Sequence, residues 1–195
     1  MRQTLTAEQL SYFTKNGHIE IEGIAFDPSL FPPAKTYETG RDHWRNHPSL
    51  KTFLLRKIGP LALDLTAKNQ LRLACDQWIP TDHPMGKPAP AKDFFSIQNL
   101  ALGAIIAPSA SPIPKRSPLG ILPLPSTPST ILFFKPTLIL DWPKLSSPIY
   151  LVLFALHNAV YVHNPKDPLT NAMKAFNYGF GDLLKNETHP LIIKE

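Results

Sequence analysis

The chain lacks most of the features that build cross-links and membrane spans. Its 195 residues include one cysteine, Cys75, so neither an internal disulfide nor a cysteine metal cluster can form. The longest apolar run, 149–156, is far shorter than the about 20 residues that a membrane-spanning helix needs. The polar N-terminus has no signal-peptide pattern. We therefore expect a cytoplasmic protein with no membrane segment and no disulfide partner.

Several catalytic signatures are also missing. The sequence contains no P-loop, no dinucleotide-binding glycine motif, no Gly-x-Ser-x-Gly elbow and no His-Glu-x-x-His pair. These absences argue against nucleotide-dependent enzymes, α/β hydrolases and zinc proteases. A carboxylate-only enzyme stays open, because paired catalytic carboxylates leave no spacing that a sequence reveals.

Proline, in contrast, is abundant. The chain has 22 prolines, about twice the usual frequency of about 5%. Proline interrupts helix interiors and is confined to loops, turns and sheet edges. This composition favours short strands joined by rigid loops over a helical bundle.

The first 22 residues carry clear local signals. Thr6 and Gln9 have the spacing of a capping box, and Gly17 supplies the left-handed residue that ends a helix. The segment 18–22 then alternates polar and apolar residues, the pattern of a half-buried strand. We predict a helix over 5–17 followed directly by a strand.

The whole chain, 1–195, is predicted to form a single domain, with an N-terminal helical and first-strand region at 1–69 and a β core with proline-rich loops at 70–195. Pro48 and Pro60 predict the starts of two short helices, with Gly59 as a break between them. Strands are predicted at 71–79, 94–107, 130–134, 137–140 and 149–162, and a short helix is predicted at 169–177. The proline- and serine-rich stretch 108–128 is predicted as a loop. The order favours an α+β fold with an antiparallel sheet.

The net charge of +5 is concentrated in one segment. Residues 41–72 hold seven basic and two acidic residues, while the remaining 13 basic and 13 acidic residues cancel. Imidazole and indole groups at 43, 44 and 47 are interleaved with these charges, as on many anion and nucleic-acid surfaces. The segment predicts an exposed face. A solvated helix face without a ligand is the favoured interpretation, and a polyanion-binding surface is the alternative. The candidate anion-binding residues are Arg41, Arg45, Lys51 and Arg56.

The opening of the chain resembles a known family. Residues 5–10, Phe13, the Asn-Gly-His at 16–18 and the strand 19–23 are similar to the start of phytanoyl-CoA dioxygenase-like proteins, which are of the Fe(II)/2-oxoglutarate dioxygenase type. The strand 71–78, with Asp76-Gln77, also lies where that family begins its barrel. The resemblance implies a double-stranded β-helix, a jelly-roll or cupin-like barrel, with N-terminal helices packed on it.

The resemblance also implies a metal site that this sequence does not contain intact. The family binds iron through His-x-Asp/Glu and a distal histidine, while an arginine or lysine holds 2-oxoglutarate. Here the only His-x-Asp/Glu is at 18–20, ahead of the barrel, and the strand 94–107 has no histidine. A partial set consists of Asp82, His83 and His157 as metal ligands and Lys166 as the cosubstrate-binding residue.

Three hypotheses follow. The favoured one is a protein of dioxygenase-type fold with a degenerate site, a non-catalytic binding or regulatory module for an unknown small ligand or a polyanion, with no cofactor expected. The first alternative is an atypical Fe(II)/2-oxoglutarate-dependent oxygenase that uses the partial set. The second is a metal-responsive nucleic-acid-binding regulator that uses residues 41–72. In all three, Cys75 is expected to be buried and inert, because it alternates with Leu71, Leu73 and Ile79.

Overall fold

The structure, a computed structural model, describes residues 4–108, 117–125 and 130–194. Its helices are α1 (Ala7–Asn16), α2 (Pro48–Phe53) and α3 (Gly59–Thr66). Its strands are β1 (His18–Ile21), β2 (Gln70–Ile79), β3 (Ala89–Pro90), β4 (Ile97–Ile106), β5 (Ile131–Phe134), β6 (Ile139–Leu140), β7 (Ile149–Tyr161) and β8 (Leu191–Ile193). Short 3-10 turns lie at Pro28–Leu30, Glu38–Gly40, His43–Arg45, Ala91–Phe94, Trp142–Lys144 and Ala172–Phe176.

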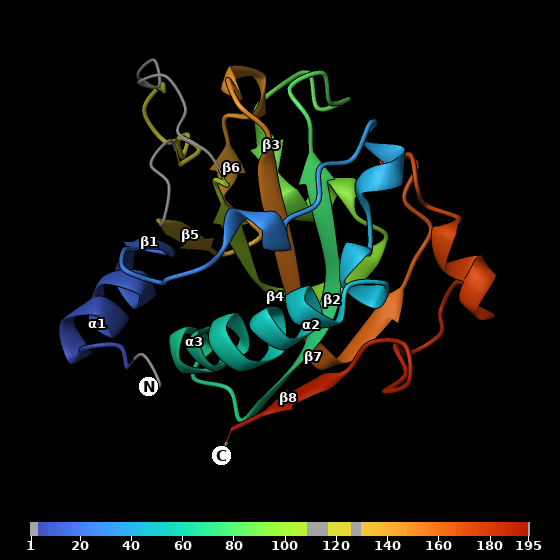
Figure 1. The fold of residues 1–195 in the computed structure, drawn as a ribbon, viewed down its shortest axis with the longest axis horizontal. Coiled ribbons are helices and arrows are strands. Elements are labelled where there is room, and N and C mark those ends of the chain that lie inside the picture. Colours follow the sequence, from blue (N-terminus) through green and yellow to red (C-terminus); the bar gives the residue numbers. More distant parts are fainter. Residues whose placement is uncertain (1–3, 109–116, 126–129, 195) are drawn as a thin grey trace.

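A six-stranded antiparallel sheet forms the centre of the molecule (Figure 1). Its spatial order is β1-β5-β4-β7-β2-β8, and β3 and β6 pair separately as a two-stranded antiparallel sheet. The prediction of a mixed α/β chain with an antiparallel sheet is therefore confirmed. Residues 109–116 and 126–128 of the predicted proline-rich loop lie outside the described residues.

The N-terminal helix forms as its local signals predict. Thr6 accepts a hydrogen bond from the backbone N–H of Gln9, and the Gln9 side chain accepts one from the N–H of Thr6. Gly17 ends α1 in the left-handed conformation, with φ at 77°. The chain then enters β1, which pairs with β5 at the sheet edge.

The predicted break at Gly59 is wrong. The helix continues through a π-helical turn, Leu54–Ile58, and Gly59 has ordinary helical angles. The glycine instead allows close packing, because a Cβ at this position would lie 2.8 Å from Cδ1 of Ile192 on β8. Pro60 has no N–H to donate to the preceding turn, and the wider turn accommodates that loss.

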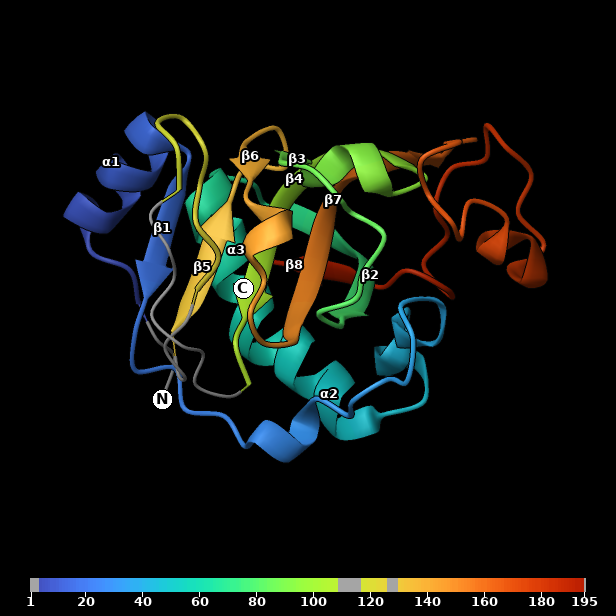
Figure 2. The same cartoon turned by 90° about the horizontal axis from the view of Figure 1, so that it is seen from above.

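Each face of the sheet packs into its own apolar cluster. The helical segment lies on one face (Figures 1 and 2). Its residues Leu50, Leu54 and Leu61 belong to one apolar cluster with Leu73 of β2 and Val152 of β7. The second cluster, on the opposite face, is called the inner face below. The two-stranded sheet covers it, and Ile105, Leu132, Phe134, Leu151 and Trp142 fill it with side chains that are essentially inaccessible to solvent.

Cys75 belongs to the inner face, which corrects its predicted side-chain direction. The pairing of β2 with β7 shifts between Leu73 and Cys75, the signature of a β-bulge. One extra residue reverses the alternation, so Cys75 shares a cluster with Ile79 and not with Leu71 or Leu73. The predicted burial is confirmed, and the predicted shared face is wrong for the two leucines.

Candidate functional site

The inner face carries one buried polar cluster, and Arg41 lies at its centre. The turn Glu38–Gly40 packs directly on β2, where a Cβ on Gly40 would lie 2.6 Å from the carbonyl oxygen of Trp78. Only glycine tolerates this approach. The turn thereby aims Arg41 inward, where its Nε donates to Oε1 of Gln77 at 2.9 Å and its guanidinium lies 4.8 Å from the ring centre of Phe95.

Asp167 neutralises this cation. Its Oδ2 accepts from Nη1 of Arg41 at 2.9 Å, and the side chain of Asp167 is fully buried. The same oxygen accepts from the backbone N–H and the hydroxyl of Ser96, at 3.0 and 2.8 Å. Burial disfavours the charged guanidinium, but the carboxylate outweighs it and holds the pKa of Arg41 above its usual value. The Arg41 guanidinium is therefore charged and held in place by Asp167.

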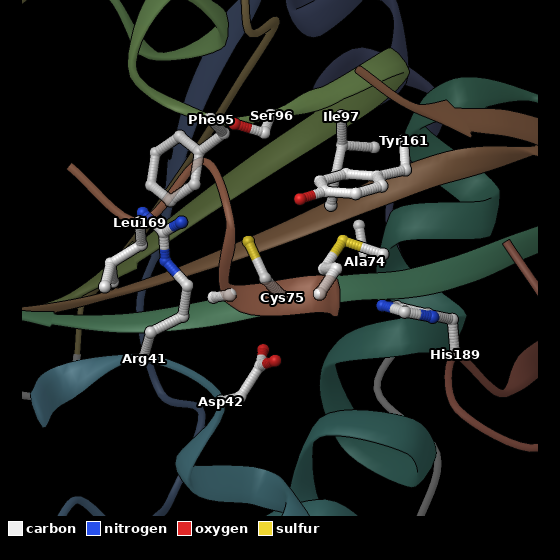
Figure 3. A pocket seen from close by; sticks show the side chains of 12 residues that line it. Arg41, Asp42, Ala74, Cys75, Phe95, Ser96, Ile97, Tyr161, Leu169 and His189 are labelled. Carbon is white, nitrogen blue, oxygen red and sulfur yellow. The ribbon is translucent and has the colours of Figure 1, made fainter. Parts of the chain in front are cut away.

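The cavity beside this pair is small. It measures about 20 Å³ and is lined by Arg41, Asp42, Cys75, Ser96 and His189 among others (Figure 3). That volume holds about one water molecule. Burial raises the pKa of the Cys75 thiol well above its usual range, although the Arg41 charge opposes the shift. The thiol is therefore protonated at neutral pH and is no nucleophile.

Two carboxylates meet at the edge of the cluster. The backbone N–H of Asp42 donates to the carbonyl of Asp76 at 3.0 Å, and Oδ2 of Asp76 accepts from the N–H of Trp44. The Oδ1 atoms of Asp42 and Asp76 are both buried without a hydrogen-bond partner in the described part of the chain. Burial, followed by the charge of Asp42, raises the pKa of Asp76 well above its usual value. Asp76 is thus poised to hold a proton.

Arg45 and Arg72 fasten the C-terminal segment to the same region. Arg45 donates to Oδ2 of Asp42, to the carbonyl of Thr188 and to Nε2 of His189. Arg72 donates to the carbonyl oxygens of His157 and His189. Burial and the two guanidinium groups lower the pKa of His189 to about 3. Because arginine only donates, His189 is neutral and carries its proton on Nδ1.

The structure does not gather the partial metal set predicted from the sequence. Both ring nitrogens of His83 bond backbone groups, Nε2 with the carbonyl of Trp142 and Nδ1 with the N–H of Met85. Asp82 and His157 are exposed, and Nζ of Lys166 lies 3.6 Å from Oδ2 of Asp93. Among the described residues, no group of three or more His, Cys, Asp and Glu side chains could hold a metal ion. Metal binding by Asp82, His83 and His157 stays a prediction.

The predicted anion-binding residues divide into two pairs. Arg41 and Arg45 have side chains only 11% and 13% exposed and bond within the protein, so the expectation that they lie on an open surface is wrong. Lys51 and Arg56 are exposed on the helical segment. Three arginines of the basic segment, at 41, 45 and 72, therefore hold the fold together, and anion binding by the segment stays a prediction for its exposed members.

Solved structures resemble this arrangement of strands. SnoK, a non-heme alpha-ketoglutarate-dependent carbocyclase from nogalamycin biosynthesis, matches with a TM-score of 0.68 over 96% of both chains at 15% identity. The chain has the fold of the Fe(II)/2-oxoglutarate dioxygenase type. The alpha-ketoglutarate-dependent epimerase SnoN gives 0.65 over 96% of both chains at 12% identity.

A chlamydial protein also matches. The whole sequence resembles an uncharacterised chlamydial protein of this fold, so this match is expected. CT296 from Chlamydia trachomatis gives a TM-score of 0.50 over 80% of this chain and 97% of its own, at 16% identity. No protein-family model and no curated protein sequence matches the chain. The likeness is thus one of fold.

The residues of the inner face do not fit the iron that this fold implies. An iron site needs three converging donors with open positions beside them. The inner face instead presents Arg41, a permanent cation, already bonded to Asp167. The cavity of about 20 Å³ next to this pair is too small for the five-carbon cosubstrate. Aliphatic and aromatic side chains fill the remainder of the inner-face cluster.

Sequence reasoning missed most of the buried cluster. Asp167 lies in a stretch, 164–168, whose prolines indicate only a turn, and its partner Arg41 is 126 residues away. Ser96 and Gln77 occupy strands, where an isolated polar residue gives no sign of what it contacts. One signal was present: Asp76 and Gln77 are adjacent polar residues inside an otherwise apolar strand, which is costly unless both find partners.

Proposed function

We propose that this chain is a non-catalytic binding or regulatory module built on the dioxygenase-type fold. The single observation that carries the proposal is the Arg41–Asp167 pair at the centre of the inner face. A buried, bonded guanidinium repels a divalent cation, and displacing it leaves Asp167 as an uncompensated buried charge.

The surroundings support the same conclusion. Gln77 and Tyr37 accept further hydrogen bonds from Arg41, while Ser96 and the backbone N–H of Leu169 donate to Asp167. Both charged groups are thus bonded within the protein. The thiol of Cys75 is buried and protonated, and His189 is neutral with both ring nitrogens engaged. None of these groups is in a state suited to nucleophilic attack or to metal ligation. The pattern is that of a polar core that specifies structure.

The test is metal retention together with oxygen consumption. Protein purified without chelators is dialysed anaerobically against Fe(II), and bound iron is measured against protein. We expect far less than one iron per chain and no 2-oxoglutarate-dependent oxygen uptake. Stoichiometric iron with such uptake would overturn the proposal and establish the atypical oxygenase. His83→Ala and His157→Ala are the variants that would then show whether the predicted ligands hold it.

A further inference from the structure

A second hollow lies at the end of the large sheet, outside the buried cluster. It is a groove of about 280 Å³, bordered by the start of β4, the turn after β5 and the residues that follow β7. This volume is close to the lower limit of about 300 Å³ for small-molecule sites. Phe95 and Ile97 line both the groove and the small cavity, so their side chains form the wall between the two.

The walls of the groove are held in place. The backbone N–H of Lys92 donates to the carbonyl of Pro136, which ties two sides together. The Asn164 amide donates to the carbonyl oxygens of Asp93 and Phe95, and the Asn99 amide donates to the carbonyl of Asn158. These bonds use asparagine side chains to fix loops, so the groove is formed before any ligand arrives.

The lining of the groove combines apolar residues with polar ones and one lysine. Leu100 and Val162 are half-buried and supply the accessible apolar surface, while Phe95, Ile97 and Pro136 are buried beneath it. Among the residues that the structure describes, no acidic one lines the groove. The one permanent charge is Lys92, an exposed cation whose amine has no ion-pair or hydrogen-bond partner among the described residues. The neighbouring carboxylate, Asp93, lies outside the lining and is instead 3.6 Å from the amine of Lys166.

We propose that this groove binds a small organic anion with a flat apolar body, such as an aryl carboxylate. The carboxylate pairs with the amine of Lys92, and the apolar body lies on Leu100 and Val162. The amide of Gln98 and the ring of His163 stand at the rim as further hydrogen-bonding groups. The ring of His163 packs edge-on against Phe180 at 5.3 Å between centres, which orients it at the rim. This site goes beyond the proposed loss of iron chemistry and does not depend on it.

The test uses three probes that separate charge from shape. Benzoate, its neutral counterpart benzamide, and acetate are titrated into 15N-labelled protein, and amide shifts are followed. We expect benzoate to shift amides around Gln98 and His163, with benzamide and acetate each about tenfold weaker, because one lacks the charge-assisted bond and the other the apolar contact. Equal binding of benzoate and benzamide, or shifts confined to other surfaces, would overturn the proposal.

Two lysine variants complete the design. Lys92→Met keeps the length of the side chain and removes its charge, and we expect it to weaken benzoate about tenfold while leaving benzamide unchanged. Lys87→Met is the matched control, because Lys87 is exposed and does not line the groove. Benzoate binding that survives in Lys92→Met, or that falls equally in Lys87→Met, contradicts the assignment. Iron retention is measured in parallel and is independent of both outcomes.

Discussion

Replacing Arg41 with methionine should destabilise the protein severely. The change removes a 2.9 Å bond to Asp167, a 2.9 Å bond to Gln77 and the contact with the ring of Phe95. Breaking one partner of a buried ion pair costs about 3–5 kcal/mol, because the other charge stays buried. Asp167 keeps two bonds from Ser96, which places the expected loss at about 3 kcal/mol, the low end of that range.

Urea unfolding followed by tryptophan fluorescence measures this loss of stability. We expect a lower urea concentration at the midpoint and an unchanged dependence of the unfolding free energy on urea concentration. Arg56→Met is the control, since that side chain is exposed and its replacement should change stability by less than about 0.5 kcal/mol. A loss of less than about 1 kcal/mol in Arg41→Met would refute this prediction.

Three further predictions concern Asp76, Cys75 and the exposed basic residues. The pKa of Asp76 is raised in the folded state, so the free energy of unfolding should fall as pH rises from the unfolded-state pKa of about 3.9 through the raised folded-state pKa. Asp76→Asn should remove this pH dependence, and parallel pH profiles of stability for both proteins from pH 4 to 8 would contradict the prediction. Cys75 should react with a thiol reagent about 100-fold or more slowly in the native than in the unfolded protein, and equal rates would show that the thiol is accessible. If the exposed basic residues bind DNA through phosphates, changing Lys51 and Arg56 to glutamine should flatten the salt dependence of log affinity by about 2; an equal effect from Lys87 and Lys185 would identify nonspecific attraction.

What the sequence predicts well is local. The capping box at Thr6 and Gln9 and the left-handed Gly17 act within one helix, and both appear in the structure as expected. The long apolar run beginning at Ile149 becomes the central strand β7, because only a buried strand accommodates it. In these segments the residues that specify the structure are neighbours in the chain.

The candidate site is different, because it depends on distant partners. A β-bulge in β2 places the Cys75 side chain on the opposite face of the sheet from Leu73, and no residue type at that position predicts the bulge. Gly59 is required in the helix because Ile192, on the last strand, approaches it too closely for a Cβ. The residues around Arg41 in the sequence are typical of a surface charge, but the fold pairs Arg41 with Asp167, which lies 126 residues later in the chain. Charge patterning therefore indicated a surface where the fold makes a buried pair.

The most direct test of the central claim is a crystal structure of the protein prepared anaerobically with Fe(II) and 2-oxoglutarate. The claim is that a closed ion pair, Arg41 with Asp167, occupies the centre of the inner face in place of a metal site. The account predicts that the pair remains intact, with Nη1 and Oδ2 about 2.9 Å apart, and that anomalous scattering detects no iron bound by protein side chains. Iron held by three protein ligands on the inner face, with Arg41 displaced from Asp167, would contradict it.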